Sequence, residues 1–226
     1  MIIQKILTAL QGKGIKRTIA YLLSYIGGIT FDIQYGTDTI SSIKIKDLKI
    51  ESNNKTRAED YEPTQVIPLC KLFKQLMIPN GKVFIDVGCG KGRVLLVASQ
   101  FGFKELRGIE FSPALRKIAT NNCSIYKEKT GISANFLIIE SDICDYEIKD
   151  EDVFFMFNPF DAHLLTYVLE NIKLSLLQRK RQIWIIYRKP VHRSIIDKDT
   201  EFLKLKEFVF WGSDFLVYTN IGMEKE

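Results

Sequence analysis

The sequence has few of the residues from which proteins build metal centres and disulfide frameworks. Its 226 residues include two histidines, His163 and His192, and four cysteines without any C-x-x-C spacing. These counts argue against the common zinc sites, and unpaired cysteines favour a reducing compartment, the cytoplasm. No apolar run approaches the roughly 20 residues of a membrane span. A small-residue cleavage signature is missing after Gly27-Gly28, so no secretory signal is expected.

The remaining composition is that of a globular chain with a full core. Hydrophobic residues make up 46% and charged residues 26% of the sequence, and the formal net charge is +5. This mild charge does not by itself indicate nucleic-acid binding. Strand-like and helix-like patterns alternate along the chain. We expect strands at Val83–Asp86, Leu106–Glu110, Asn135–Ile139, Val153–Phe157, Gln182–Tyr187, Phe202–Phe210 and Phe215–Asn220, and helices at Val66–Met77, Lys91–Phe101, from Ser112-Pro113 onward, at Ala162–Leu177 and at Val191–Ile196.

This alternation predicts an α/β fold, a parallel sheet with helices on both faces. The last two strands flank Gly212-Ser213 and should close the sheet as an antiparallel hairpin. In such sheets ligands bind at the carboxyl ends of the strands. Polar residues at those ends are therefore the candidate site residues.

The run VFIDVGCGKGR, Val83 to Arg93, is the most informative motif. A buried strand ends near Asp86 and runs into Gly88, Gly90 and Gly92, which let the backbone approach a ligand closely. The dinucleotide fingerprint G-x-G-x-x-G has a different spacing, and the acid before the glycines would repel a phosphate. The motif therefore favours a cationic or amino-bearing ligand over a nicotinamide cofactor.

With this motif the chain resembles the class I S-adenosylmethionine (SAM) dependent methyltransferases. The resemblance implies a Rossmann-like class I methyltransferase fold, with a seven-stranded, mostly parallel sheet ending in an antiparallel hairpin. It also implies SAM as the cofactor. Asp86 and the three glycines would hold the methionine end of SAM, and no metal is required.

Two further strand ends carry acids where the family places them. The resemblance implies that Glu110 accepts hydrogen bonds from both ribose hydroxyls, a task that suits the two oxygens of a carboxylate. Phe111 either packs an apolar face against the adenine or belongs to the core. After the third strand, Asp142 would accept from the adenine amino group and Ile143 would flank the ring, although Glu140 and Asp145 compete with Asp142.

The fourth strand ends in Asn158-Pro159-Phe160, which is similar to the [NDS]-P-P-[FYW] motif of amino-group methyltransferases. The resemblance implies that Asn158 and a prolyl carbonyl orient the target nitrogen, that Phe160 covers it, and that Asn158 also contacts the cofactor. Orientation and exclusion of water supply most of the acceleration in such a transfer. Because this chain has one proline where the family has two, the acceptor atom stays open. The alternative is an ordinary strand-to-helix turn.

Tyr61-Glu62-Pro63-Thr64-Gln65, ahead of the helix at Val66–Met77, resembles a segment of two methyltransferase groups. One is an uncharacterised bacterial group, which Phe31-Asp32 and Tyr35–Thr39 also resemble. The other contains protein-lysine methyltransferases of the Dot1 type. In both, the segment closes over the methionine part of SAM, so Tyr61 and Thr64 are candidate cofactor contacts. The alternative role of Thr64 is to cap the helix.

The predicted function is SAM-dependent N-methylation, with protein lysine as the favoured acceptor. Arg188, Lys189 and Arg193 follow the fifth strand and should lie near the acceptor entrance, where an acidic protein, a phosphorylated metabolite or RNA could use them. Few aromatic residues accompany them, so protein or a small molecule is favoured over nucleic acid. The alternatives are a methyltransferase for a small molecule or an RNA base, and a non-catalytic SAM-binding module.

The first 31 residues contain no acid and carry Lys5, Lys13, Lys16 and Arg17. Their apolar residues recur at helical spacing up to Gly27-Gly28, where we expect the stretch to end. We predict a basic, helical extension over residues 1–54, closing with a hairpin or loop, and a methyltransferase domain over residues 55–226. The extension either covers the core or cofactor, or forms a basic amphipathic surface for peripheral contact with a membrane or an acidic partner.

Overall fold

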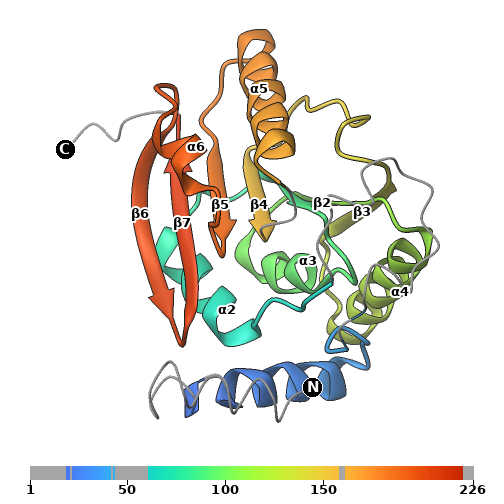
Figure 1. The fold of residues 1–226 in the computed structure, drawn as a ribbon. Coiled ribbons are helices and arrows are strands. Elements are labelled where there is room, and N and C mark those ends of the chain that lie inside the picture. The colour runs from blue at the N-terminus through green and yellow to red at the C-terminus, as the bar shows by residue number, and fades with distance from the viewer. Residues whose placement is uncertain (1–18, 21, 42, 44–60, 158–160, 221–226) are drawn as a thin grey trace.

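A seven-stranded sheet with the order β3-β2-β1-β4-β5-β7-β6 forms the centre of the molecule (Figure 1). The computed structural model describes residues 19–20, 22–41, 43, 61–157 and 161–220. The strands are β1 (Val83–Val87), β2 (Glu105–Glu110), β3 (Asn135–Glu140), β4 (Val153–Phe157), β5 (Trp184–Arg188), β6 (Leu203–Phe210) and β7 (Ser213–Thr219).

Strands β1 to β5 are parallel, whereas β7 is antiparallel to both β5 and β6. The predicted mostly parallel sheet with a closing antiparallel hairpin is therefore confirmed. Every residue of β1 and β5 is buried, which explains why these strands are continuous apolar runs rather than alternating ones.

Helices cover both faces of the sheet. They are α2 (Val66–Leu76), α3 (Arg93–Ala98) with a 3₁₀ turn at Ser99–Phe101, α4 (Pro113–Thr130), α5 (Ala162–Gln178) and α6 (Arg193–Asp197). One apolar cluster joins the sheet to α2, α3 and α4, and a second joins the opposite face to α5 and α6. The α4 start is the predicted one, because the Ser112 hydroxyl accepts from the Leu115 N–H and Pro113 follows at the first helical position.

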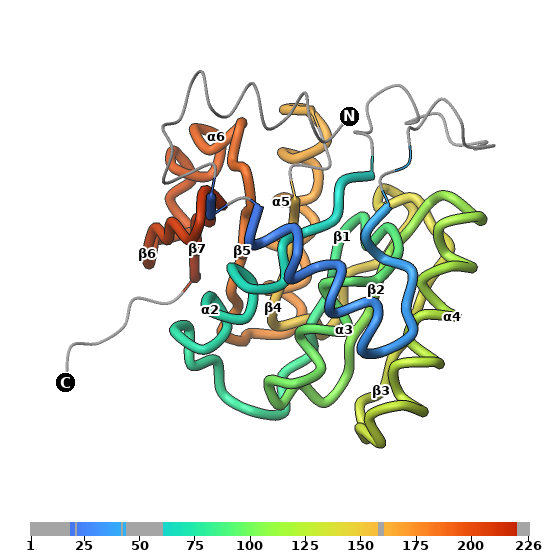
Figure 2. The backbone as a smooth tube through the Cα atoms, turned by 90° about the horizontal axis from the view of Figure 1, so that it is seen from below, coloured from blue at the N-terminus to red at the C-terminus, as the bar shows by residue number. Residues whose placement is uncertain are grey.

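The N-terminal region contains a helix over residues 22–35, which lies across the carboxyl-end edge of the parallel strands, beside α2 and α3 (Figure 2). The expectation that the stretch ends at Gly27-Gly28 is wrong, because the helix continues through both glycines. Close packing explains them: a Cβ at Gly27 would lie 2.9 Å from Ile67, and one at Gly28 would lie 2.8 Å from the Arg93 guanidinium.

The predicted hairpin or loop after this helix falls largely outside the described residues. Ile43 and Tyr61 form an isolated antiparallel bridge, which brings the end of the described N-terminal segment to the start of the segment that precedes α2. None of the helices in the described ranges has both the length and the apolar character that crossing a membrane requires.

Candidate SAM site

The glycine-rich loop leaves the carboxyl end of β1 and enters α3. Gly88, Gly90 and Gly92 all have positive φ, at 78°, 55° and 83°, which only glycine adopts without strain. The N–H groups of Gly88 and Cys89 both donate to the carbonyl of Ile109 on β2. The loop is therefore held against the neighbouring strand in one conformation.

Gly108 of β2 provides the room for this arrangement, a role that was not predicted. A Cβ at Gly108 would lie 2.7 Å from the sulfur of Cys89 and 2.8 Å from Leu95. The missing side chain lets the loop and α3 pack directly on the strand. A glycine inside a strand pattern often marks such a close approach, and this was the available signal.

Glu110 ends β2 and its carboxylate is fixed by the loop. The Gly90 N–H donates to its Oε2 and the Ser112 N–H donates to its Oε1, both at 2.9 Å. Burial raises the pKa of Glu110 to about 7, although these two backbone hydrogen bonds oppose the increase. Each carboxylate oxygen keeps a second lone pair, which is the capacity that binding a vicinal diol requires.

Asp86 is buried in β1 with 3% of its surface exposed. Within the part of the chain that the structure describes, nothing donates a hydrogen bond to its carboxylate. Burial, and then the charge of Glu110, raise its pKa well above the ordinary value. Nor does any lysine or arginine of the described residues pair with Asp86 or Glu110. Burying two carboxylates without a cation is costly, so the site suits a ligand that carries positive charge.

The acids after β3 differ in their surroundings. Glu140 forms an exposed ion pair with Arg116 at 2.7 Å. Its carboxylate is therefore engaged by α4 rather than directed at the glycine loop. Asp142 is half-buried, accepts from the Cys144 N–H, and follows Ser141, whose N–H donates to the Glu110 carbonyl. Ile143 is buried. Asp142 therefore lies next to the Glu110 strand end, as an adenine contact requires.

Phe111 directly follows Glu110 and is half-buried. It precedes Ser112, whose N–H holds the Glu110 carboxylate. The assignments of Phe111, Asp142 and Ile143 stay predictions.

Tyr61 lies directly over the glycine loop. A Cβ at Gly90 would overlap the Tyr61 ring, so the ring occupies the space above a residue that has no side chain. The Tyr61 hydroxyl donates to the Thr39 carbonyl at 2.9 Å, and burial raises its pKa above the ordinary value. The structure thus brings Tyr61 together with the glycines, as the predicted closing segment requires.

Thr64 connects the segment that contains Tyr61 to β5 and α3. Its hydroxyl accepts from the Arg188 guanidinium at 3.2 Å, and its carbonyl accepts from Arg93 at 3.5 Å. Its side chain does not cap α2, which begins at Val66 after Gln65 with no side-chain capping bond. The capping alternative for Thr64 is therefore excluded.

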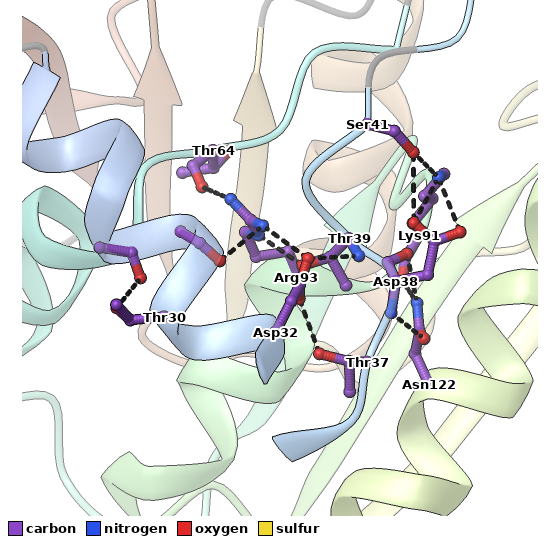
Figure 3. A network of polar contacts seen from close by, with 12 residues as sticks. Thr30, Asp32, Thr37, Asp38, Thr39, Ser41, Thr64, Lys91, Arg93 and Asn122 are labelled. Atoms are coloured by element: carbon purple, nitrogen blue, oxygen red, sulfur yellow. Dashed lines mark hydrogen bonds and ion pairs between the residues drawn. The ribbon is translucent and has the colours of Figure 1, made fainter. Parts of the chain in front are cut away.

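The N-terminal segment is joined to the glycine loop by a polar network that the sequence analysis did not identify (Figure 3). Arg93 bonds Asp32, the Thr39 hydroxyl and the Gly28 carbonyl. Asp32 in turn accepts from Thr37 and from both the N–H and hydroxyl of Thr39. The segment 32–39 therefore folds around one buried ion pair.

A second link lies two residues earlier in the glycine motif. The Lys91 ammonium is buried and lies 3.1 Å from both carboxylate oxygens of Asp38. Asn122 of α4 accepts from the Asp38 N–H and donates to the carbonyls of Asp38 and Lys91. The sequence signal was present in Asp32 and Asp38, two acids in a segment that already resembled a methyltransferase group, but their distant partners could not be inferred.

The carboxyl ends of β4 and β5 form the other half of the site. Phe157 and Arg188 are paired in register, and the Arg188 guanidinium lies 3.7 Å from the Phe157 ring centroid. Asn158, Pro159 and Phe160, the predicted acceptor-orienting residues, lie outside the described residues. Of the basic residues predicted nearby, Arg193 is engaged by Asp197 and Glu207.

The strand order reverses between β1 and β4, and ligands of doubly wound sheets bind at such a point. The glycine loop, Asp86 and Glu110 all lie beside it, and the charge of the two acids fits the ammonium and diol groups of SAM. This fold and this site define the class I SAM-dependent methyltransferases. Residues 34–191 match the model of the family described as histone methylation protein DOT1, and the chain belongs to that family.

The chain is also similar to curated methyltransferases and to solved structures of the same fold. A ribosomal protein L11 methyltransferase of Ruminiclostridium cellulolyticum is 25% identical over 35% of this chain and 24% of its own length. A SAM-dependent methyltransferase of Aquifex aeolicus shares the fold with a TM-score of 0.53 at 17% identity, covering 68% of this chain and 89% of its own.

A third similar protein was solved with its cofactor. Magnesium protoporphyrin IX methyltransferase of Synechocystis PCC 6803, solved with bound SAM, has a TM-score of 0.51 at 15% identity over 69% of this chain and 78% of its own. The chain spans between a quarter and about half of the length of the curated relatives it matches, 24% and 53%. The solved structures therefore show the fold alone, and the family is shown by the match over residues 34–191.

Proposed function

We propose that the protein transfers a methyl group from SAM to an amino nitrogen of a protein, with lysine as the favoured residue. The observation that carries this proposal is the pair of buried carboxylates, Asp86 and Glu110, beside the glycine loop. Among the described residues no lysine or arginine pairs with either of them, because Lys91 and Arg93 pair with acids of the N-terminal segment. SAM supplies a methyl group on a sulfonium, which passes to a nitrogen lone pair and leaves S-adenosylhomocysteine.

The chain's own residues divide into those that hold the cofactor and those that orient the acceptor. Asp86 pairs with the ammonium, Glu110 accepts from the ribose hydroxyls, and Tyr61 closes over the glycine loop. Asn158 and Pro159 directly follow β4 in the sequence, and β4 is the neighbour of β1 in the sheet, so an oxygen of these two residues is our candidate for the acceptor contact. That oxygen accepts hydrogen bonds from the amine and directs its lone pair, while Phe160 excludes water.

A protein acceptor is favoured by the family and by one relative. The family model is described as a histone methylation protein, and the L11 methyltransferase is named for a protein substrate. The surroundings of the predicted entrance argue against a nucleic-acid interface. Arg188 is buried and bonded to Thr64, and Arg193 pairs with two carboxylates, so neither forms part of an open basic surface.

The test is transfer of labelled methyl from SAM into a cell lysate, followed by separate treatment with protease, nuclease and organic solvent. We expect protease alone to release the label, and acid hydrolysis to yield methyl-lysine. Label that nuclease or solvent removes would refute the protein acceptor. Labelled methylamine in the hydrolysate, which acid releases from the side-chain amide of N5-methylglutamine, would refute lysine while keeping a protein acceptor.

Two variants separate binding from turnover. Asp86→Ala should abolish SAM binding, whereas Asn158→Ala should bind SAM normally and lose transfer. Normal transfer by Asn158→Ala would disprove its role in orienting the acceptor. SAM binding by the wild type without transfer of label into any fraction would identify a non-catalytic SAM-binding module.

A further inference from the structure

Four aliphatic side chains form a stripe along the outer face of the N-terminal helical residues, 19–20 and 22–35. Ile19, Leu23, Ile26 and Ile33 are 50%, 47%, 52% and 77% exposed. Their spacing of four, three and seven residues places them on one side of a helix. We refer to these four residues as the aliphatic stripe.

The helix cannot hide this stripe by turning. Its other face is fixed to the domain, because Ser24, Gly28, Phe31 and Asp32 are buried. Arg93 holds Asp32 by an ion pair and the Gly28 carbonyl by a hydrogen bond. Rotation would break the buried ion pair, so the stripe stays on the surface while the domain is folded.

The stripe lacks the charges that normally cover a solvent-facing helix. Residues 19–31 include no Asp, Glu, Lys or Arg, and Asp32 points into the protein. The outer faces of surface helices are usually polar or charged. An uncharged face of exposed aliphatic residues, interrupted by the exposed Thr30, marks a surface that contacts something else.

The charge of the neighbouring sequence and the types of the stripe residues indicate which partner this surface binds. The residues immediately before the stripe carry Lys5, Lys13, Lys16 and Arg17 and no acid. An aliphatic helix face that basic residues precede in the sequence is typical of segments that bind anionic lipid at the membrane interface. Protein interfaces instead depend on Trp, Tyr and Arg anchors, and none of the four stripe residues is of these types.

We propose that the aliphatic stripe docks the protein peripherally on an anionic lipid surface. The helix lies across the edge toward which the arrows of β4 and β5 point (Figure 1, Figure 2). Docking through its outer face therefore brings the carboxyl-end edge, where the SAM site lies, close to the lipid headgroups. A methyl acceptor at the membrane surface would then be within reach.

The experiment is vesicle flotation of the full chain with phosphatidylcholine alone and with added phosphatidylglycerol. The test variant is Ile26→Ser/Ile33→Ser. The matched control is Leu174→Ser/Leu177→Ser, which removes two aliphatic residues that are 55% and 78% exposed on α5. Neither pair belongs to the SAM site, so SAM affinity and thermal stability should stay those of the wild type and show that both variants are folded.

We expect the wild type and the α5 control to float with anionic vesicles and the stripe variant to bind roughly tenfold more weakly. Binding should weaken at high salt and on neutral vesicles, because the basic residues contribute through screened electrostatics. Equal flotation of the stripe variant and the wild type would overturn the proposal. So would no flotation of the wild type, or a concentration-dependent dimer that only the stripe variant loses, which would assign the stripe to a second copy of the chain.

Discussion

A guanidinium nitrogen of Arg93 lies 3.3 Å from the Oδ2 of Asp32, and both side chains are buried. Arg93 begins the helix after the glycine loop, and Asp32 lies near the end of the N-terminal helix. The pair therefore ties the segment that covers the site to the segment that holds the cofactor. Its contribution can be tested separately from the chemistry of methyl transfer.

Asp32→Asn should lower the free energy of unfolding by about 3 kcal/mol, because it leaves a buried guanidinium without its counter-charge. Urea denaturation followed by circular dichroism measures the change. Glu140→Gln is the control, since Glu140 pairs with Arg116 at an exposed position and should change stability by less than about 1 kcal/mol. Equal changes in the free energy of unfolding for the two substitutions would show that the buried pair stabilises the protein no more than the exposed pair does.

Asp86→Asn should separate stability from binding. The amide keeps the shape of the side chain and removes a buried charge that no described residue compensates, so the cofactor-free protein should be at least as stable as the wild type at pH 8. SAM affinity should fall by about a hundredfold, since the ammonium loses its counter-charge. Calorimetry of binding and a thermal melt on the same sample check both. Unchanged affinity would contradict the assignment of Asp86 to the ammonium.

The raised pKa of Glu110, about 7 against an ordinary 4.5, predicts opposite pH effects on stability and binding. Because the folded-state pKa is higher, the stability it contributes to the cofactor-free protein is fully present below pH 4.5. That contribution is lost as the pH rises through 7. The ionised form accepts from two ribose hydroxyls, so SAM affinity should increase over the same range and binding should release protons.

Titration calorimetry in buffers of different ionisation enthalpy measures this proton release at pH 6. Glu110→Gln should reduce it and flatten the pH dependence of affinity. The same release from the variant as from the wild type would assign the titration to another group.

Gly90→Ala should weaken SAM binding by more than tenfold, because the added methyl group would displace the Tyr61 ring. Gly131→Ala is the matched control. Gly131 also has positive φ, at 66°, but a Cβ there would meet nothing within 4 Å, so it carries the backbone strain of about 1–2 kcal/mol without the contact. Equal losses of SAM affinity in the two variants would mean that strain alone is responsible.

The sheet could be predicted closely because its signals are local. The strand Val153–Phe157 is a buried apolar run bounded by Asp152 and Asn158, and its predicted and observed limits are identical. The fifth strand was predicted two residues early, at Gln182 instead of Trp184, because the pattern of burial does not mark where strand pairing begins.

The contacts of the N-terminal helix could not be predicted, because they depend on residues far away in the sequence. Gly27-Gly28 is a helix-ending signal when only neighbours are considered, yet Ile67 and Arg93 need both glycines to approach the helix. The acids of the candidate site could be predicted because the family motif marks their positions, whereas Asp32 has no comparable local marker. The division into residues 1–54 and 55–226, and the cytoplasmic location, stay predictions.

The ion pair between Asp32 and Arg93 also constrains the order in which the molecule can be assembled. The two residues are separated by 61 positions, so the ribosome has released the N-terminal helix well before its guanidinium partner exists. During that interval both faces of the helix lack their final neighbours. The N-terminal helix can therefore reach its final position only after β1 and α3 have been synthesised and folded. Contacts of such long sequence separation are slow to form.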